Sequence, residues 1–156
     1  MLDASDQRIL ADVENFGWHV VGVGPARGSD DPDETFAYTV GLGKTFRWPE
    51  IICFGLDVDV MMHLLNDAVA EVRERGVELS AGLVLDQVLD GLPARLELAA
   101  PMAHHYVSSA RWFAQHEGLP DPCVLQLLWP DKSGAFPDDP GCVEDVRAAQ
   151  TPLEAA

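Results

Sequence analysis

The spacing of apolar residues predicts helices at three places along the chain. Apolar side chains recur at helical spacing over Ser5–Phe16, and Gly17 follows where a left-handed cap would end a helix. A second helix is expected after Asp57, a good N-cap residue, and it should end at Gly76. A third helix is expected over Ser108–Glu117, with a glycine directly after it.

Between these helices lie shorter apolar segments that are rich in β-branched and aromatic residues or alternate in polarity, as strands do. In the segment Ala94–Ala100, Leu96 and Leu98 are expected to face inward. A short helical turn is expected near Asp86–Asp90. The predicted strands are Trp18–Val23, Phe36–Leu42, Ile51–Leu56, Ala94–Ala100 and Val124–Trp129.

Because the helices do not alternate regularly with the strands, the order of elements predicts an α+β fold with a mainly antiparallel sheet. Five or six strands and about three helices are expected. The chain of 156 residues fits a single domain, which we place at residues 1–136. Residues 137–156 are rich in proline and acid and are expected to form a loosely attached tail.

Two of the predicted strands carry mostly small residues on one side. Ala37, Thr39 and Gly41 alternate with larger residues in one strand, and Cys53 and Gly55 do so in another. Small side chains permit close approach by another group. A packed helix and a bound ligand both remain open as the group that approaches.

The excess of acidic residues narrows the classes of molecule that the protein is expected to bind. Asp and Glu number 26 against 10 Lys and Arg, which gives a formal net charge of -16. Such a charge repels nucleic-acid phosphates and anionic membrane surfaces, so neither is expected as a partner. A small molecule, a peptide or a basic protein remains open, and the sequence does not indicate the oligomeric state.

Cysteine usage and the N-terminal segment both favour a cytoplasmic location. Cys53, Cys123 and Cys142 form neither a CxxC pair nor a disulfide framework, and Cys53 and Cys123 are expected to be small buried hydrophobes. The first residues have neither the basic start nor the apolar core of a signal peptide. No apolar run is long enough to cross a bilayer.

Familiar cofactor and catalytic motifs are absent from the sequence. It contains no GxxxxGK[ST] phosphate loop, no GxGxxG after a strand, no GxSxG elbow and no HExxH. His104, His105 and His116 lack sound ligand spacing, so no metal is expected. No cofactor is expected either.

Several polar or amphipathic residues stand in segments that otherwise have the pattern of a core. A buried polar side chain needs a partner, so these residues are expected to converge around one cleft or to satisfy one another. They are Tyr38, Thr39, Glu50, His105, Arg111, Gln126 and Trp129.

Each role in that cleft follows from the chemistry of the side chain. Arg111 would anchor an anionic group, and His105 would carry a proton with Glu50 or Asp131 orienting it. Gln126 would fix the orientation of a ligand. The structural alternative is an internal ion pair of Arg111 with Glu50 or Asp131, with Gln126 satisfying the backbone of a loop.

Six segments of the chain together carry a resemblance to a known family. They are Gly17–Val20, Phe36–Leu42, Pro49–Ile51, His105–Tyr106, Ala110–Phe113 and Val124–Asp131. In their order and spacing they resemble a bacterial family of uncharacterised proteins, the domain-of-unknown-function family 4262. The family often has a histidine before its Pro-Glu pair, where this chain has Trp48. The resemblance implies a bacterial, cytoplasmic domain and brings no established activity.

Three functions therefore stay open. The first is an accessory module that binds a small molecule or a peptide, which fits the missing catalytic motifs. The second is an enzyme that uses His105 with Glu50 or Asp131 as general acid and base. The third is an acidic interaction or inhibitor domain that binds a basic protein.

Overall fold

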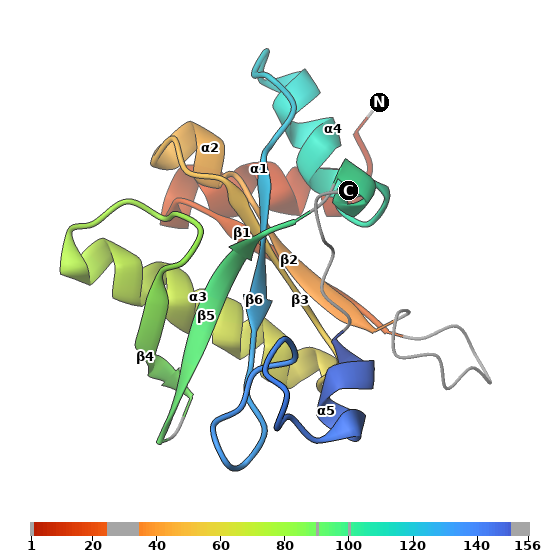
Figure 1. Ribbon diagram of the computed structural model, residues 1–156. Coiled ribbons are helices and arrows are strands. Elements are labelled where there is room, and N and C mark those ends of the chain that lie inside the picture. The colour runs from red at the N-terminus through yellow and green to blue at the C-terminus, as the bar shows by residue number, and fades with distance from the viewer. Residues whose placement is uncertain (1, 25–34, 90, 100, 151–156) are drawn as a thin grey trace.

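The computed structural model describes residues 2–24, 35–89, 91–99 and 101–150. A six-stranded sheet forms its centre, with the strands in the order β1-β2-β3-β6-β5-β4 (Figure 1). Neighbouring strands are antiparallel except for β3 and β6, which run parallel. The strands are β1 (His19–Val23), β2 (Phe36–Val40), β3 (Glu50–Phe54), β4 (Val84–Leu89), β5 (Leu92–Leu98) and β6 (Val124–Leu128).

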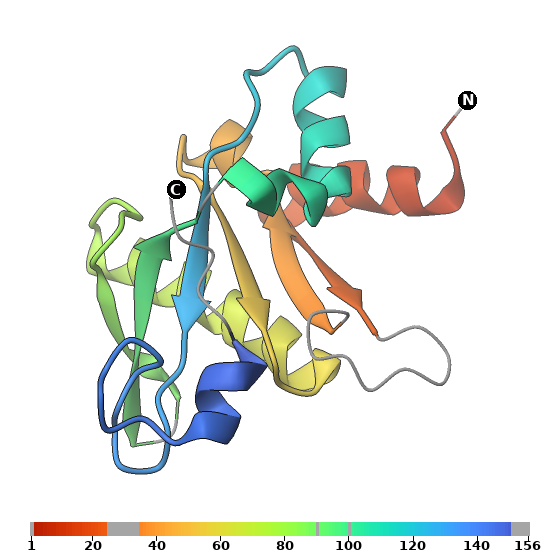
Figure 2. The same cartoon turned by 45° about the vertical axis from the view of Figure 1, so that its right-hand side comes forward.

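Helices cover both faces of the sheet (Figure 2). One face packs against α3, and the other packs against α1, η2 and α4. The helices are α1 (Ala4–Phe16), α2 (Leu42–Thr45), α3 (Val58–Arg75), the 3-10 helix η2 (Pro101–His105), α4 (Ser108–His116) and α5 (Glu144–Ala149).

The alternating side chains of the central strands divide the core into two clusters. Ala37 and Cys53 point toward α3 and pack with Met61, so the small residues of β2 and β3 accommodate a helix. Tyr38 and Ile52 point to the opposite face, toward α1 and α4. The helix alternative for the small-residue side of these strands is therefore correct.

The predicted mixed architecture with a mainly antiparallel sheet is confirmed. The described residues contain six strands and five α-helices, so the prediction of about three helices was too low. The two helices that were missed, α2 and α5, span four and six residues and leave little periodicity in the sequence.

The helical turn expected near Asp86–Asp90 is wrong, because Val84–Leu89 is strand β4. Leu85 pairs with Ala94 and Leu89 with Leu92, so the register shifts between them. Such a bulge changes the alternation of a strand, and residues three apart, Leu85 and Val88, are both buried. That spacing of three imitates a helix in the sequence.

Other corrections concern the ends of strands. β2 ends at Val40 because Gly41 has a φ of 98°, and Leu42 begins α2 instead of extending the strand. Leu98, expected to face inward, is 51% exposed at the end of β5. Cys123, expected to be buried, is exposed immediately before β6.

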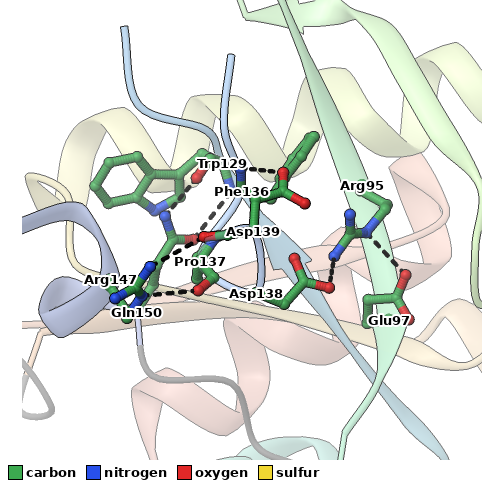
Figure 3. Close-up of polar contacts among 9 residues, drawn as sticks. All are labelled: Arg95, Glu97, Trp129, Phe136, Pro137, Asp138, Asp139, Arg147 and Gln150. Atoms are coloured by element: carbon green, nitrogen blue, oxygen red, sulfur yellow. Dashed lines mark hydrogen bonds and ion pairs between the residues drawn. The ribbon is translucent and has the colours of Figure 1, made fainter. Parts of the chain in front are cut away.

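The acidic C-terminal segment is attached by polar contacts as far as residue 150 (Figure 3). The Gln150 side chain is fully buried, accepts a hydrogen bond from the Trp129 amide at 2.9 Å and donates one to the Trp129 carbonyl. Arg147 donates to the carbonyls of Pro137 and Asp139, both at 3.0 Å. The expected looseness therefore does not hold for residues 137–150, while the domain boundary at residue 136 stays a prediction.

Arg95 connects the same segment to β5. Its guanidinium lies 2.7 Å from the Asp138 carboxylate and 2.9 Å from the Glu97 carboxylate (Figure 3). It also lies over the Phe136 ring, 4.6 Å from the centroid. In the part of the chain that the structure describes, no helix has the length and apolarity needed to cross a membrane.

Candidate functional site

Glu50 is the centre of a buried polar network at the start of β3. The Thr39 hydroxyl donates to Glu50 Oε1 at 2.8 Å, and the amides of Gly41 and Leu42 donate to its two oxygens at 2.9 and 3.3 Å. Thr39 Oγ1 in turn accepts from the Ile51 amide at 2.9 Å. The carboxylate thus holds the turn from β2 into α2 against β3.

Burial dominates the electrostatics of Glu50, which is 3% exposed. Desolvation raises the pKa of this carboxyl from 4.5 to about 7, against the lowering effect of the Thr39, Gly41 and Leu42 hydrogen bonds. The three partners are all donors from the protein itself. This geometry favours a structural role, with the carboxylate turned toward the backbone.

The other predicted site residues lie in separate places. The Tyr38 hydroxyl accepts a hydrogen bond from the Ser109 amide at 3.2 Å, in the first turn of α4. Trp129 Nε1 donates to the Phe54 carbonyl at 2.9 Å, at the end of β3 opposite to Glu50. Tyr38 and Thr39 point to opposite faces of the sheet, so these residues do not line one cleft.

Arg111, His105 and Gln126 complete the predicted set. Arg111 lies 3.6 Å from Asp121, and both side chains are more than a third exposed, so the expected partners Glu50 and Asp131 are wrong. His105 is exposed, and no hydrogen bond joins it to Glu50 or Asp131 among the described residues. Gln126 is buried in β6, in register with Ile52 and Glu97.

Asp131 organises the turn after β6. Its Oδ1 accepts from the Ser133 amide, the Ser133 hydroxyl and the Ala135 amide at 2.6–3.0 Å, and Oδ2 accepts from the Val143 amide at 3.0 Å. These bonds, with the Ser133 hydroxyl first, lower its pKa from 3.8 to about 2. An enzyme that uses His105 with Asp131 thus stays a prediction without a contact to support it.

A pocket of about 380 Å³ lies beside β1. Its walls come from α1, from α3 and from the first residues of β1, and we call it the edge pocket. Since α1 and α3 cover opposite faces of the sheet, a pocket lined by both lies over the outer edge of β1. The lining residues are Arg8, Asp12, Phe16, Trp18, His19, Val20, Met62 and Asn66.

His19 is the best-positioned titratable group of the edge pocket. Its Nδ1 lies 2.6 Å from Asp12 Oδ2, and the two side chains are 16% and 32% exposed. A carboxylate at this distance accepts a hydrogen bond from a protonated Nδ1 and orients the ring. With the proton on Nδ1, a neutral imidazole has Nε2 as an acceptor, and this nitrogen has no hydrogen-bond partner among the described residues.

Trp18 supplies a fixed aromatic surface next to His19. Its indole N–H donates to Asn66 Oδ1 at 2.8 Å, and the Phe46 ring lies 6.2 Å from its own ring. The Arg73 guanidinium lies over the indole, 5.4 Å from the centroid. These three contacts restrict the orientation of the indole.

Basic side chains without a carboxylate partner gather near this pocket. Arg8 lines it and Arg73 covers Trp18, and neither forms an ion pair with any described residue. In contrast, Arg75, Arg95 and Arg147 all lie within 3.3 Å of a carboxylate. In a chain with 26 acidic residues, these two arginines keep their guanidinium groups available to an anion, beside the Asp12–His19 pair.

A second pocket, of about 680 Å³, lies on the other side of α1. Leu10, Val13 and Phe113 are among its apolar lining. Its polar groups are already engaged with each other: Lys44 contacts Glu117, and His116 Nδ1 lies 3.2 Å from the same carboxylate. The Lys44 contact lowers the pKa of Glu117. The edge pocket is therefore the better candidate, because it keeps Arg8 and His19 Nε2 available.

The described residues contain no group of three His, Cys, Asp or Glu side chains placed to hold a metal ion. The sequence reasoning missed the edge pocket, although two signals were present. Asp12 and His19 flank the end of the first helix, and Arg8 precedes Asp12 by one helical turn. Their meeting depends on how the chain turns at Gly17, which local patterns do not specify.

The profile of a protein family described as "Domain of unknown function (DUF4262)" matches residues 12–143. The chain belongs to this family. The match spans β1 through the Asp131 turn and includes Asp12 and His19 of the edge pocket, while Arg8 lies before it. A search of curated proteins and a search of solved structures found no match. The bacterial source and cytoplasmic location stay predictions.

Proposed function

We propose that this domain is a binding module whose ligand occupies the edge pocket. The ligand carries an anionic group that pairs with Arg8 and an N–H or O–H donor that bonds to His19 Nε2. The observation that carries the proposal is the pocket itself, in which one unpaired cation and one oriented imidazole lie beside a fixed indole.

The chemistry of the lining selects the ligand class. An arginine side chain binds carboxylates well because its planar fork of donors matches their geometry. Phe16, which is 68% exposed, and the Trp18 indole offer apolar surface for the rest of the ligand. A pocket with apolar walls and a few oriented polar groups is typical of small-ligand sites.

Hippurate is a suitable probe, because it combines a carboxylate, an amide N–H and an aromatic ring. Its binding should be measured by ligand-observed NMR beside hippurate methyl ester, which lacks the charge, and N-methylhippurate, which lacks the donor. We expect hippurate to bind at least about tenfold more tightly than either analogue.

Single substitutions test whether hippurate binds in the edge pocket. Arg8→Gln and His19→Ala should each weaken hippurate binding, while Lys132→Gln should not. Lys132 is an exposed base without an ion pair to any described residue, so its removal changes the net charge by the same amount as Arg8→Gln. Equal binding of hippurate and its methyl ester, or equal binding by wild type and Arg8→Gln, would contradict the proposal.

A further inference from the structure

The two edges of the sheet are built differently. At β4 the register shifts between Leu85 and Leu89, and Asp86 places a charge in the strand. Bulges and charges are common devices that stop an edge strand from pairing with another chain. At β1 all five residues stay in register with β2, from His19 opposite Val40 to Val23 opposite Phe36.

The β1 edge lacks those devices. Between Val20 and Val23 the strand contains no charged residue, no proline and no bulge, and no described strand pairs with its outer side (Figure 2). An edge strand leaves every second N–H and C=O without a partner in the sheet. The edge of β1 can therefore accept one more strand.

The edge pocket lies at the start of this strand, beside Trp18, His19 and Val20. A peptide that added antiparallel to β1 would have its C-terminus at this end, because antiparallel partners run in opposite directions. The anionic group that Arg8 favours would then be the terminal carboxylate. The N–H donor for His19 Nε2 would come from the peptide or from one of its side chains.

We infer that the ligand is the C-terminal segment of another polypeptide, which extends the sheet at β1 and places its terminal carboxylate beside Arg8. This inference rests on the proposed function and adds a partner class to it. Main-chain hydrogen bonds along β1 supply affinity in such strand addition, and the pocket supplies specificity for the chain end. The net charge of -16 disfavours a second copy of this chain as the occupant.

The test uses matched peptide pools and amide hydrogen exchange. The pools are N-acetylated pentapeptides, equal in length to the five residues of β1, with alternating β-branched and polar residues. One pool has free C-termini, a second has C-terminal amides, and a third has free C-termini with N-methyl groups on alternate backbone nitrogens. Isotope-labelled protein reports both affinity and the exchange of individual β1 amides.

We expect the free-acid pool to bind at least about tenfold more tightly than the other two. It should also slow exchange of those β1 amides that point away from β2, and Arg8→Gln should abolish its advantage over the amide pool. Hippurate should bind without slowing those amides, because it is too short to pair along the strand.

The following results would contradict strand addition alone or both proposals together. Binding of hippurate without the free-acid pool, or equal binding of the N-methylated pool, would overturn strand addition and leave the pocket intact. Failure of hippurate and all three pools would overturn the proposed function as well. Concentration-dependent dimerisation that protects β1 would identify a second copy as the occupant and overturn this inference.

Discussion

Glu50 and Asp131 are buried carboxylates at opposite ends of the parallel strands β3 and β6, and each is 3% exposed. Both collect hydrogen bonds from backbone amides, yet their pKa values move in opposite directions, to about 7 for Glu50 and about 2 for Asp131. Asp131 accepts four hydrogen bonds, three from Ser133 and Ala135 in the turn after β6 and one from the Val143 amide, whereas Glu50 accepts three and lies between the central strands.

Two carboxyl groups with the same exposed fraction can therefore have pKa values that shift in opposite directions. At Asp131 the hydrogen bonds to the ionised form outweigh desolvation, and at Glu50 desolvation outweighs the hydrogen bonds. Both carboxylates satisfy the protein's own donors. The accessible Asp12 differs from them, because it orients a histidine that keeps a ring nitrogen available to a ligand.

The largest expected effect is loss of stability in Glu50→Ala. The change leaves Gly41, Leu42 and Thr39 without their acceptor, at roughly 1–3 kcal/mol for each buried donor. We expect about 4 kcal/mol less free energy of unfolding, which corresponds to a melting temperature lower by about 10 °C. Thermal and urea unfolding at pH 7 would measure it. Glu74→Ala, an exposed carboxylate on α3, is the control and should change little.

The second effect is a pH dependence of stability that belongs to Glu50. The pKa of this group is about 7 in the folded state and near 4.5 in the unfolded chain, so the folded state keeps its proton to higher pH. Its contribution is present below about pH 4.5 and is lost as the pH rises to about 7, a change of about 3 kcal/mol. In Glu50→Gln this part of the curve should be flat. If Glu50→Gln kept the same slope as wild type between pH 4.5 and pH 7, the pH dependence would not come from Glu50.

The sequence alone could predict that some polar residues of the strands are buried, but not which of them are in contact. The strand positions of Thr39, Glu50 and Gln126 identified them as polar groups in core segments, and all three are buried. Their alternation along a strand could not show which of them meet, because that depends on strand order. The parallel pairing of β3 with β6 places Trp129 beside Phe54 and away from Glu50.

The candidate site was harder to predict for the same reason. Asp12, His19 and Asn66 come from a helix, a strand and a second helix, and no local spacing connects all three. The short helices α2 and α5 depend on tertiary contacts as well. Glu50 accepts hydrogen bonds from the Gly41 and Leu42 amides at the start of α2, and Gln150 fixes the end of α5 to Trp129.

A smaller effect is expected at Asp131. In Asp131→Asn an amide group replaces one oxygen, so one of the donors from Ser133, Ala135 or Val143 meets another donor. We expect a melting temperature a few degrees lower at pH 7. The pKa of Asp131 is lowered from 3.8 to about 2, so its contribution is present above about pH 4 and is lost as the pH falls toward 2.

The difference between wild type and Asp131→Asn should therefore shrink below pH 4, where the Glu50 contribution is complete. Melting curves of both proteins from pH 2 to pH 7 would test this. If the two melting temperatures differed by the same amount across that range, the negative charge of Asp131 would contribute nothing to stability. Only Glu50 would then make stability depend on pH.

The smallest effect on stability is expected at Asp12, and it separates the accessible carboxylate from the two buried ones. Asp12 and His19 are both partly exposed, and pairs of this kind contribute about 0–1 kcal/mol to stability. Asp12→Ala should therefore unfold almost as wild type does, yet it frees the His19 ring to rotate and to exchange tautomers. We expect severalfold weaker hippurate binding with little change in melting temperature, and Asp12→Asn, which keeps an oxygen acceptor, should retain more of the affinity. If Asp12→Ala instead destabilised the fold as much as Glu50→Ala, all three carboxylates would be structural and the edge pocket would lose its positioning residue.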